Sequence, residues 1–244
     1  NTQSLTLNAG TGGAISVAQT IGASSRFPTL SVTDSNGATF DGSVATGTSV
    51  VLTDTTDAAN ITFNGILTTP TLTTAAQAYD LDILGGGTAI TNNVAILSTG
   101  TLALGNDAGD TLTFAGGLTA TAPSGVTVNG QIRSSGATVS LGDTNTAVTL
   151  AGALSIIDTT NNGGTAAGGA ITLGGAVNGT TANTQSLTLN AGTGGAISAT
   201  GNIGASTTLA TLTVTNSNGA TFNGSVTTGT SVVLTDTTDA ANIT

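Results

Sequence analysis

The sequence predicts an all-β fold, a parallel β-solenoid built from roughly triangular coils, and three observations support this prediction. A segment of 182 residues begins to repeat within the chain, a shorter motif recurs at intervals near 23 residues, and the composition is rich in β-branched residues and turn formers. Units that cannot bury their apolar side alone do so by stacking on their neighbours, so internal repetition of this kind is typical of solenoids.

The long repeat is read directly from the sequence. Residues 1–16 recur unchanged as residues 183–198, and residues 1–62 are identical to residues 183–244 at 50 of 62 positions. We therefore divide the chain into one full unit, residues 1–182, and the first third of the next, residues 183–244, with no separate globular domain. Because the pattern is already under way at Asn1 and breaks off at Thr244, we expect the chain to be a piece of a longer polypeptide.

The short motif reads apolar, Thr, apolar, any residue, Gly, any residue, apolar. It occurs seven times, centred on Thr39, Thr62, Thr113, Thr127, Thr149, Thr172 and Thr221. The intervals are 23, 51, 14, 22, 23 and 49 residues, so all but the interval of 14 fit a coil of about 23 residues or two such coils. On this basis the 182-residue unit holds about eight coils, which rise by about 38 Å at the usual strand spacing of about 4.8 Å.

Residues 47–70 show how one coil is expected to fold. Three short apolar stretches, at 50–52, 61–63 and 66–67, alternate with polar turns. Alternation along a strand sends Ile61 and Phe63 into the core and Thr62 outward. The Gly that follows allows a corner where a Cβ atom would clash or where φ is positive.

Differences between the two repeat copies suggest which positions lie outside the core. Asp34 and Asp41 become Asn216 and Asn223, which predicts a turn role for these side chains more than a role for their charge. Residues 26–28 change entirely, so we expect them to form a loop outside the strand ladder. By contrast, the apolar residues 50–52 return unchanged, as core positions would.

The composition excludes several classes of function. Charged residues make up 6% of the chain and the net charge is −10; the basic residues are Arg26 and Arg133. Nucleic acid is therefore not expected as a partner, because phosphate neutralisation needs clusters of Lys and Arg. Cys is absent, and no apolar run is long enough for a membrane-spanning helix. Hydrophobic residues reach 38%, which argues against disorder despite 54 Thr and 36 Gly residues.

These features together resemble giant repetitive bacterial surface proteins. Near-identical long repeats, coils such as TFNG, richness in Thr, Asn, Gly and Ala, and the absence of Lys and Cys are similar to filamentous-haemagglutinin-like and autotransporter-type adhesins and other extracellular fibre proteins. The resemblance covers the whole chain. It implies secretion across a bacterial envelope, a β-helix, and roles in attachment, sheath or biofilm.

Catalysis is not expected, and no catalytic or cofactor-binding residue is assigned. The chain has no His, Cys, Lys or Glu, so the usual general bases and nucleophile partners are missing. Paired carboxylates can hydrolyse glycosides. The candidate pairs are Asp80 with Asp82, Asp107 with Asp110, and Asp54 with Asp57. Polysaccharide clefts also use basic and aromatic residues, which are scarce here, so an enzyme is a remote alternative.

Bound ions and ice are weaker hypotheses than plain turns and outward strand residues. Calcium prefers oxygen ligands, and residues 105–112 loosely resemble a Gly- and Asp-rich calcium repeat around Asp107 and Asp110. Asp54 and Asp57 are a second possibility. All four are interpreted as turn caps, and no metal ligand is assigned. Thr-x-Thr triplets are scattered at 71–73, 111–113 and 211–215, whereas an ice-binding face needs them on every coil.

The functional expectation is therefore structural. We expect a component of a secreted extracellular filament, sheath or matrix fibre on a bacterial surface, whose partner is another copy of itself, end to end or side by side. The alternative is an adhesin stalk or binding module that recognises a glycan, a surface or a neighbouring cell. Near-identical repeats favour the first, because a specific binding site needs one distinctive place.

Overall fold

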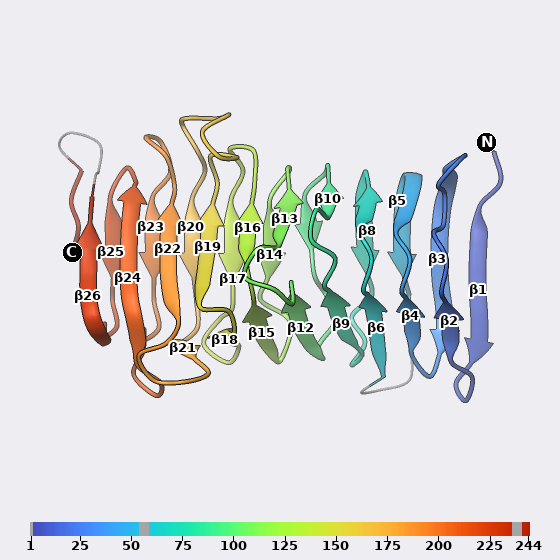
Figure 1. Ribbon diagram of the computed structural model, residues 1–244, viewed down its shortest axis with the longest axis horizontal. Coiled ribbons are helices and arrows are strands. Elements are labelled where there is room, and N and C mark those ends of the chain that lie inside the picture. Colours follow the sequence, from blue (N-terminus) through green and yellow to red (C-terminus); the bar gives the residue numbers. More distant parts are fainter. Residues whose placement is uncertain (1, 54–58, 236–240) are drawn as a thin grey trace.

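The computed structural model describes residues 2–53, 59–235 and 241–244, and within them it contains 26 strands and no helix. The strands form a parallel β-solenoid of about 10 stacked coils of about 23 residues each (Figure 1). All pairings between named strands are parallel, and each strand pairs with a strand of a neighbouring coil. The predicted fold class is thus confirmed. Among the described residues, no helix has the length and apolarity that crossing a bilayer requires.

The strands fall into three hydrogen-bonded sheets whose strands succeed one another along the solenoid axis. The twelve-stranded sheet contains β1 (Leu5–Gly10), β3 (Phe27–Ser35), β5 (Val44–Leu52), β7 (Leu67–Thr69), β8 (Thr71–Thr74), β10 (Ala89–Ile90), β13 (Thr111–Phe114), β16 (Gln131–Arg133), β19 (Leu154–Asp158), β22 (Ser186–Asn190), β24 (Leu209–Asn216) and β26 (Thr228–Leu234). The eight-stranded sheet contains β2 (Ile15–Val17), β4 (Ala38–Phe40), β6 (Asn60–Phe63), β9 (Asp80–Ile83), β12 (Thr101–Leu104), β15 (Gly125–Val128), β18 (Ala147–Leu150) and β21 (Val177–Gly179). The six-stranded sheet contains β11 (Val94–Ala95), β14 (Leu118–Ala120), β17 (Val139–Leu141), β20 (Ile171–Leu173), β23 (Ile197–Ala199) and β25 (Ala220–Phe222).

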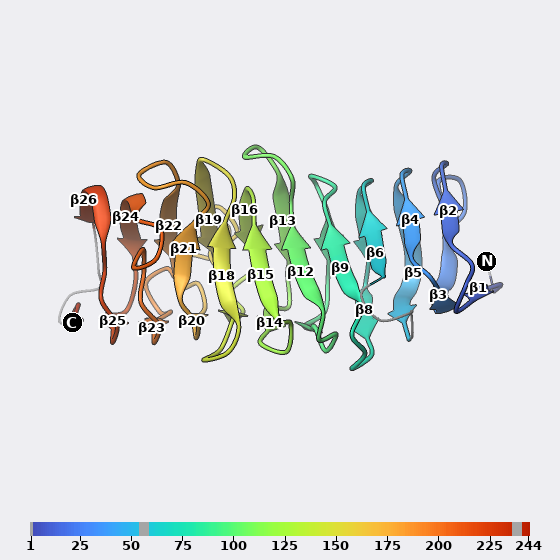
Figure 2. The same ribbon diagram turned by 90° about the horizontal axis from the view of Figure 1, so that it is seen from below.

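The twelve-stranded sheet covers two sides of the triangle because β5 bends around a corner. Residues 44–45 of β5 pair with β7, and residues 49–52 pair with β8. Side I therefore begins with β1, β3, residues 49–52 of β5 and β8. It continues into the six-stranded sheet, because the backbone N–H of Leu97, just after β11, donates to Thr74 Oγ1 of β8 at 2.7 Å. Side II is the eight-stranded sheet, seen from below in Figure 2. Side III runs from β7 through β10 to β26.

The core is one continuous apolar column enclosed by the three sides. Ile61 and Phe63 are fully buried and Thr62 points outward, as predicted. The rings of Phe40 and Phe63, one coil apart, stack with centroids 4.9 Å apart and planes inclined by 8°. Stacking of identical positions from coil to coil thus joins the coils into a single core.

Glycine recurs at corners because successive backbones pass too close there for a Cβ atom. A Cβ on Gly65 would lie 2.4 Å from Gly42 C, and one on Gly85 would lie 2.3 Å from Gly65 O. Gly130 meets the second expectation, a positive φ, because its φ angle is +109°. Both parts of the expectation for the motif glycines are therefore met, at different corners.

The motif interval of 14 residues also has a structural cause. Thr113 lies on β13 on side III, and Thr127 lies on β15 on side II. From β13 the chain runs through β14 on side I to β15, an advance of two sides instead of the three of a full coil. The same strand-and-corner motif therefore serves different sides of the triangle.

Two expectations about variable positions were wrong. Phe27 and Pro28 do not form a loop outside the ladder, because β3 begins at Phe27, which is half-buried and pairs with Thr46; of the three residues, only Arg26 lies outside the strand. The ladder is irregular between Phe27 and Thr29, and Pro28, which has no backbone donor, sits at this bulge. Asp34 is not in a turn but in β3, where it pairs with Asn8.

Candidate functional site

The outer faces of the three sides carry mainly hydroxyl and amide groups. On the six-stranded sheet, one row of outward positions passes in register through Thr119, Ser140, Thr172, Ser198 and Thr221. The Thr-x-Thr triplets do not stack on one another. Thr111 and Thr113 pair with Gln131 and Arg133, so the regular array that ice binding requires is interrupted there.

The first candidate acid pair, Asp80 and Asp82, lies on the outer face of β9. Asp80 Oδ1 accepts a hydrogen bond from Thr101 N at 2.5 Å, and Asp82 Oδ2 accepts from Thr62 Oγ1 and Asn60 Nδ2, both at 3.1 Å. Each carboxylate thus ties its strand to a neighbouring coil. This is the role of a side-chain ladder between coils.

Asp107 and Asp110 come together in the turn between β12 and β13. Asp110 Oδ2 accepts hydrogen bonds from the backbone N–H groups of Asn106 and Asp107, at 2.9 and 3.0 Å, and Asp107 Oδ1 accepts from Gly109 N at 2.8 Å. The bond of Asp107 is of the Asx type, and those of Asp110 close the same turn from its far end. The described residues contain no group of three or more His, Cys, Asp or Glu side chains placed to hold a metal ion. Asp54 and Asp57 lie outside the described residues.

One further acidic turn has an altered acidity. The backbone N–H of Asn145 is the main group that holds the pKa of the Asp143 carboxyl below its ordinary value; desolvation opposes it, and the side chain and backbone N–H of Thr146 add to the lowering. The Asp143 Oδ1 atom accepts from Asn145 N at 2.8 Å and from Thr146 N at 2.9 Å. The charge is thus used to close a turn.

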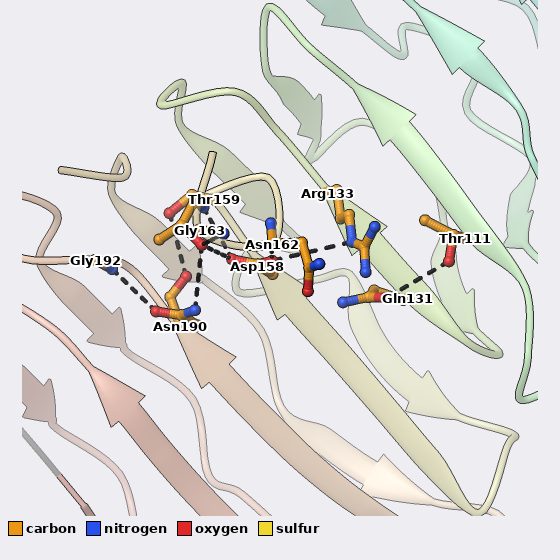
Figure 3. A network of polar contacts seen from close by, with 10 residues as sticks. Thr111, Gln131, Arg133, Asp158, Thr159, Asn162, Gly163, Asn190 and Gly192 are labelled. Carbon is orange, nitrogen blue, oxygen red and sulfur yellow. Dashed lines mark hydrogen bonds and ion pairs between the residues drawn. The ribbon is translucent and has the colours of Figure 1, made fainter. Parts of the chain in front are cut away.

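The most distinctive polar cluster was not predicted, and it centres on Asp158 at the end of β19 (Figure 3). This carboxylate is buried, with 3% of the residue exposed. Its Oδ1 accepts from Thr160 Oγ1 at 2.6 Å and Thr160 N at 2.9 Å, and its Oδ2 accepts from Asn162 N at 2.7 Å. Arg133 Nε lies 4.0 Å from Oδ2, so the ion pair adds a charge interaction without a hydrogen bond at that atom.

The cluster anchors a long loop, residues 159–170, that projects from the solenoid between β19 and β20 (Figure 1). Asn190 Nδ2, on the next coil, donates to Thr160 Oγ1 at 3.3 Å, and Thr159 Oγ1 donates to Gly169 O at 2.7 Å. Asn161 and Asn162 adopt positive φ angles of 52° and 57°, which Asn tolerates better than most residues. The carboxylate therefore adds to the backbone bonds that tie this loop to the neighbouring coils, such as Thr193 N to Ala166 O at 3.1 Å.

Beside the loop lies an open depression of about 320 Å³. It is lined by Thr160, Gly163, Ala166, Asn190, Thr193, Thr215 and Asn216. None of these residues is charged or aromatic, and hydroxyl and amide groups supply its polarity. Such a surface suits a small neutral polar group better than an ion.

A signal for this cluster was present in the sequence. Residues 158–170 form a long stretch between two apolar strands that lacks Val, Leu, Ile and Phe, and Arg133 is one of two basic residues. What the sequence could not give is the register that places Arg133, Asp158 and Asn190 on three consecutive coils.

Comparison with known proteins yields no relative. No protein-family model matches the chain, no curated protein is significantly similar in sequence, and no solved structure matches it significantly.

Proposed function

We propose that this chain is a non-catalytic structural component of a secreted extracellular filament, sheath or matrix fibre on a bacterial surface. The observation that carries the proposal is the unbroken stacking of coils from β1 to β26 around one apolar core. Such a body resists bending and grows in length by adding further coils of the same kind, so length and stiffness are what the architecture supplies.

The surface chemistry supports a structural role. Most outward strand positions are Thr, Ser or Asn, the acidic side chains described above cap turns or bridge coils, and the buried carboxylate of Asp158 holds a loop. A face of this kind remains hydrated without much charge, and it can associate with another copy through hydroxyl and amide contacts.

Electron microscopy of the purified chain, with increasing concentration, tests this proposal. We expect long fibres of uniform width, because the edges of β1 and β26 expose unpaired backbone groups that template further strands. A population that stays as short particles at every concentration would contradict it.

The depression beside the 159–170 loop favours a second candidate, an adhesin module that binds a neutral glycan. Replacing Ala166 by Trp fills the depression and leaves the side-chain bonds of Asp158 in place. If the chain binds immobilised glycans and this variant does not, while both form fibres, recognition is the better description. Equal binding by the two proteins would dismiss the depression as the site.

A further inference from the structure

The two copies of the repeat occupy different sides of the solenoid. β1 is on side I, but the same residues in the second copy form β22 on side III. β2 is on side II and its copy β23 is on side I. Ile21 bridges to Val44 on side III, whereas its copy Ile203 bridges to Val177 on side II. All three sides are thus exchanged in the same cyclic order.

The number of coils in one unit follows from the strand order. After β1, side I is visited by β3, β5, β8, β11, β14, β17 and β20, which makes seven full coils. The chain then passes β21 on side II and reaches β22 on side III, two further thirds of a coil. We infer that the 182-residue repeat is a screw operation of 7⅔ coils, and that its end face accepts the next coil of the repeat turned by two thirds of a revolution.

Identical residues can occupy any side because the three sides offer the same environment. On each side, strands alternate between core-facing and outward residues and end at a tight corner. At about 4.8 Å per coil, one unit advances the axis by about 37 Å, and three units, or 23 coils, restore the starting side after about 110 Å. A surface feature of the unit, such as the 159–170 loop, then appears on all three sides in turn.

The coil that fits on the exposed β26 edge can be inferred from the first repeat, where the equivalent strand β5 is covered by the next coil. Val232 and Leu234 of β26 are 47% and 49% exposed, yet their equivalents Val50 and Leu52 in β5 are fully buried. In the first copy β8 covers this strand, and Ser49 pairs with Thr71 and Leu52 with Thr74. The occupant of the β26 edge is therefore a coil with the sequence of residues 63–90.

Turning by two thirds of a revolution fixes where this coil lies. Its copy of β8 pairs with β26 on side III, its copy of β7 lies beside Val226 on side II, and its copy of β9 lies beside residues 242–244 on side I. None of these strands takes the side that it has in the first copy. This inference rests on the proposed structural role, since a fibre of such units grows only if its end takes another coil.

Disulfide formation tests the inference, because the chain has no Cys. Residues 63–90 are appended after Thr244, with Cys replacing Ser231 and the appended copy of Thr71. Adjacent strands lie about 4.8 Å apart, within the Cα range of a disulfide. We expect an intramolecular disulfide in a yield within about twofold of that of the reference pair, S49C with T71C, whose original residues lie opposite each other on β5 and β8.

The matched control carries Asp in place of the appended copies of Leu67, Leu72 and Tyr79, whose originals are buried. It should give no bond, and hydrogen exchange in residues 228–235 should be at least about tenfold faster than with the intact addition. A second pair checks the rotation itself: S198C should join T172C on side I and should not join N178C on side II.

An unbonded addition, a bond between S198C and N178C, or, in the extended chain, β26 paired with β1 of a second molecule in place of the addition would overturn the inference. These outcomes are distinct from failure of the structural role. If the addition does not dock but fibres still form, the screw is wrong and the role stands. If the addition docks but no fibres form under any condition, the role is wrong and the screw stands.

Discussion

Leu52 and Leu234 are the same residue in the same local sequence, but only Leu52 is covered by a further coil. Replacing Leu by Ala removes about three methylene equivalents, worth about 2.4 kcal/mol of transfer free energy if fully buried. At Leu52, which is 0% exposed, a closed cavity adds to this, so L52A should lower the free energy of unfolding by about 3–5 kcal/mol. At Leu234, which is 49% exposed, about half of the transfer term applies and no closed cavity forms, so L234A should cost about 1 kcal/mol.

Urea denaturation of the two variants and the unchanged chain, followed by far-ultraviolet circular dichroism, measures both values. Because solenoids can unfold from their ends, the slope with urea should be compared as well as the midpoint. Equal costs at the two sites, or a larger cost at Leu234, would refute the idea that each coil is stabilised by the coil that covers it.

Three further changes test the corners and the polar turns. G65A should lower the free energy of unfolding, measured by urea denaturation, by about 3 kcal/mol or more, because its Cβ would lie within 2.6 Å of three backbone atoms of the previous coil. G125A has open space around its Cβ and should leave the free energy of unfolding nearly unchanged. D158A should cost about 3 kcal/mol, since it leaves three donors without a charged acceptor, and it should open residues 159–170 to proteolysis, detected by mass spectrometry of the fragments. The pKa of Asp143 is lower in the folded than in the unfolded chain, so its contribution to stability is present above the unfolded pKa of 3.8 and is lost as pH falls through the folded pKa. In urea denaturation series from pH 7 to pH 2, D143N should therefore be less stable than the unchanged chain at neutral pH and should match it only below that range.

Each of these changes has a control and an outcome against it. D107A removes an exposed turn cap, so cleavage of residues 159–170 in D107A as fast as in D158A would show that Asp158 does not organise the loop. D41N copies a change that the second repeat already carries as Asn223, so it should leave the free energy of unfolding at pH 7 nearly unchanged. If G65A and G125A are equally stable, the corners do not depend on close backbone contact. If D143N differs from the unchanged chain at every pH, its effect does not come from ionisation.

Composition and periodicity predicted the fold because coil stacking depends on few rules. Alternation placed Ile61 and Phe63 in the core and Thr62 outside, and the motif glycines marked corners, since both patterns are local. The side of the triangle on which a strand lies is not local. It depends on the summed length of all preceding turns, and for this reason the interval between Thr113 and Thr127 could be explained only from the structure.

The polar sites were less predictable than the core. Asp107 and Asp110 share a turn as expected, because they are close in sequence. The members of the cluster around Asp158 come from three coils, because Arg133 lies on the coil before it and Asn190, which donates to Thr160, on the coil after it; their meeting depends on register, which no local pattern encodes. Phe27 and Pro28 were misplaced because their change between copies was taken as a sign of a loop, whereas an irregular strand also tolerates such a change.

X-ray diffraction from an oriented film of the purified chain tests most directly whether successive coils hydrogen-bond to one another along one axis. The parallel ladders from β1 to β26 predict a strong reflection at about 4.8 Å along the long axis of the particles. A film of aligned particles without that reflection, or with it only across the long axis, would contradict the stacked-coil structure.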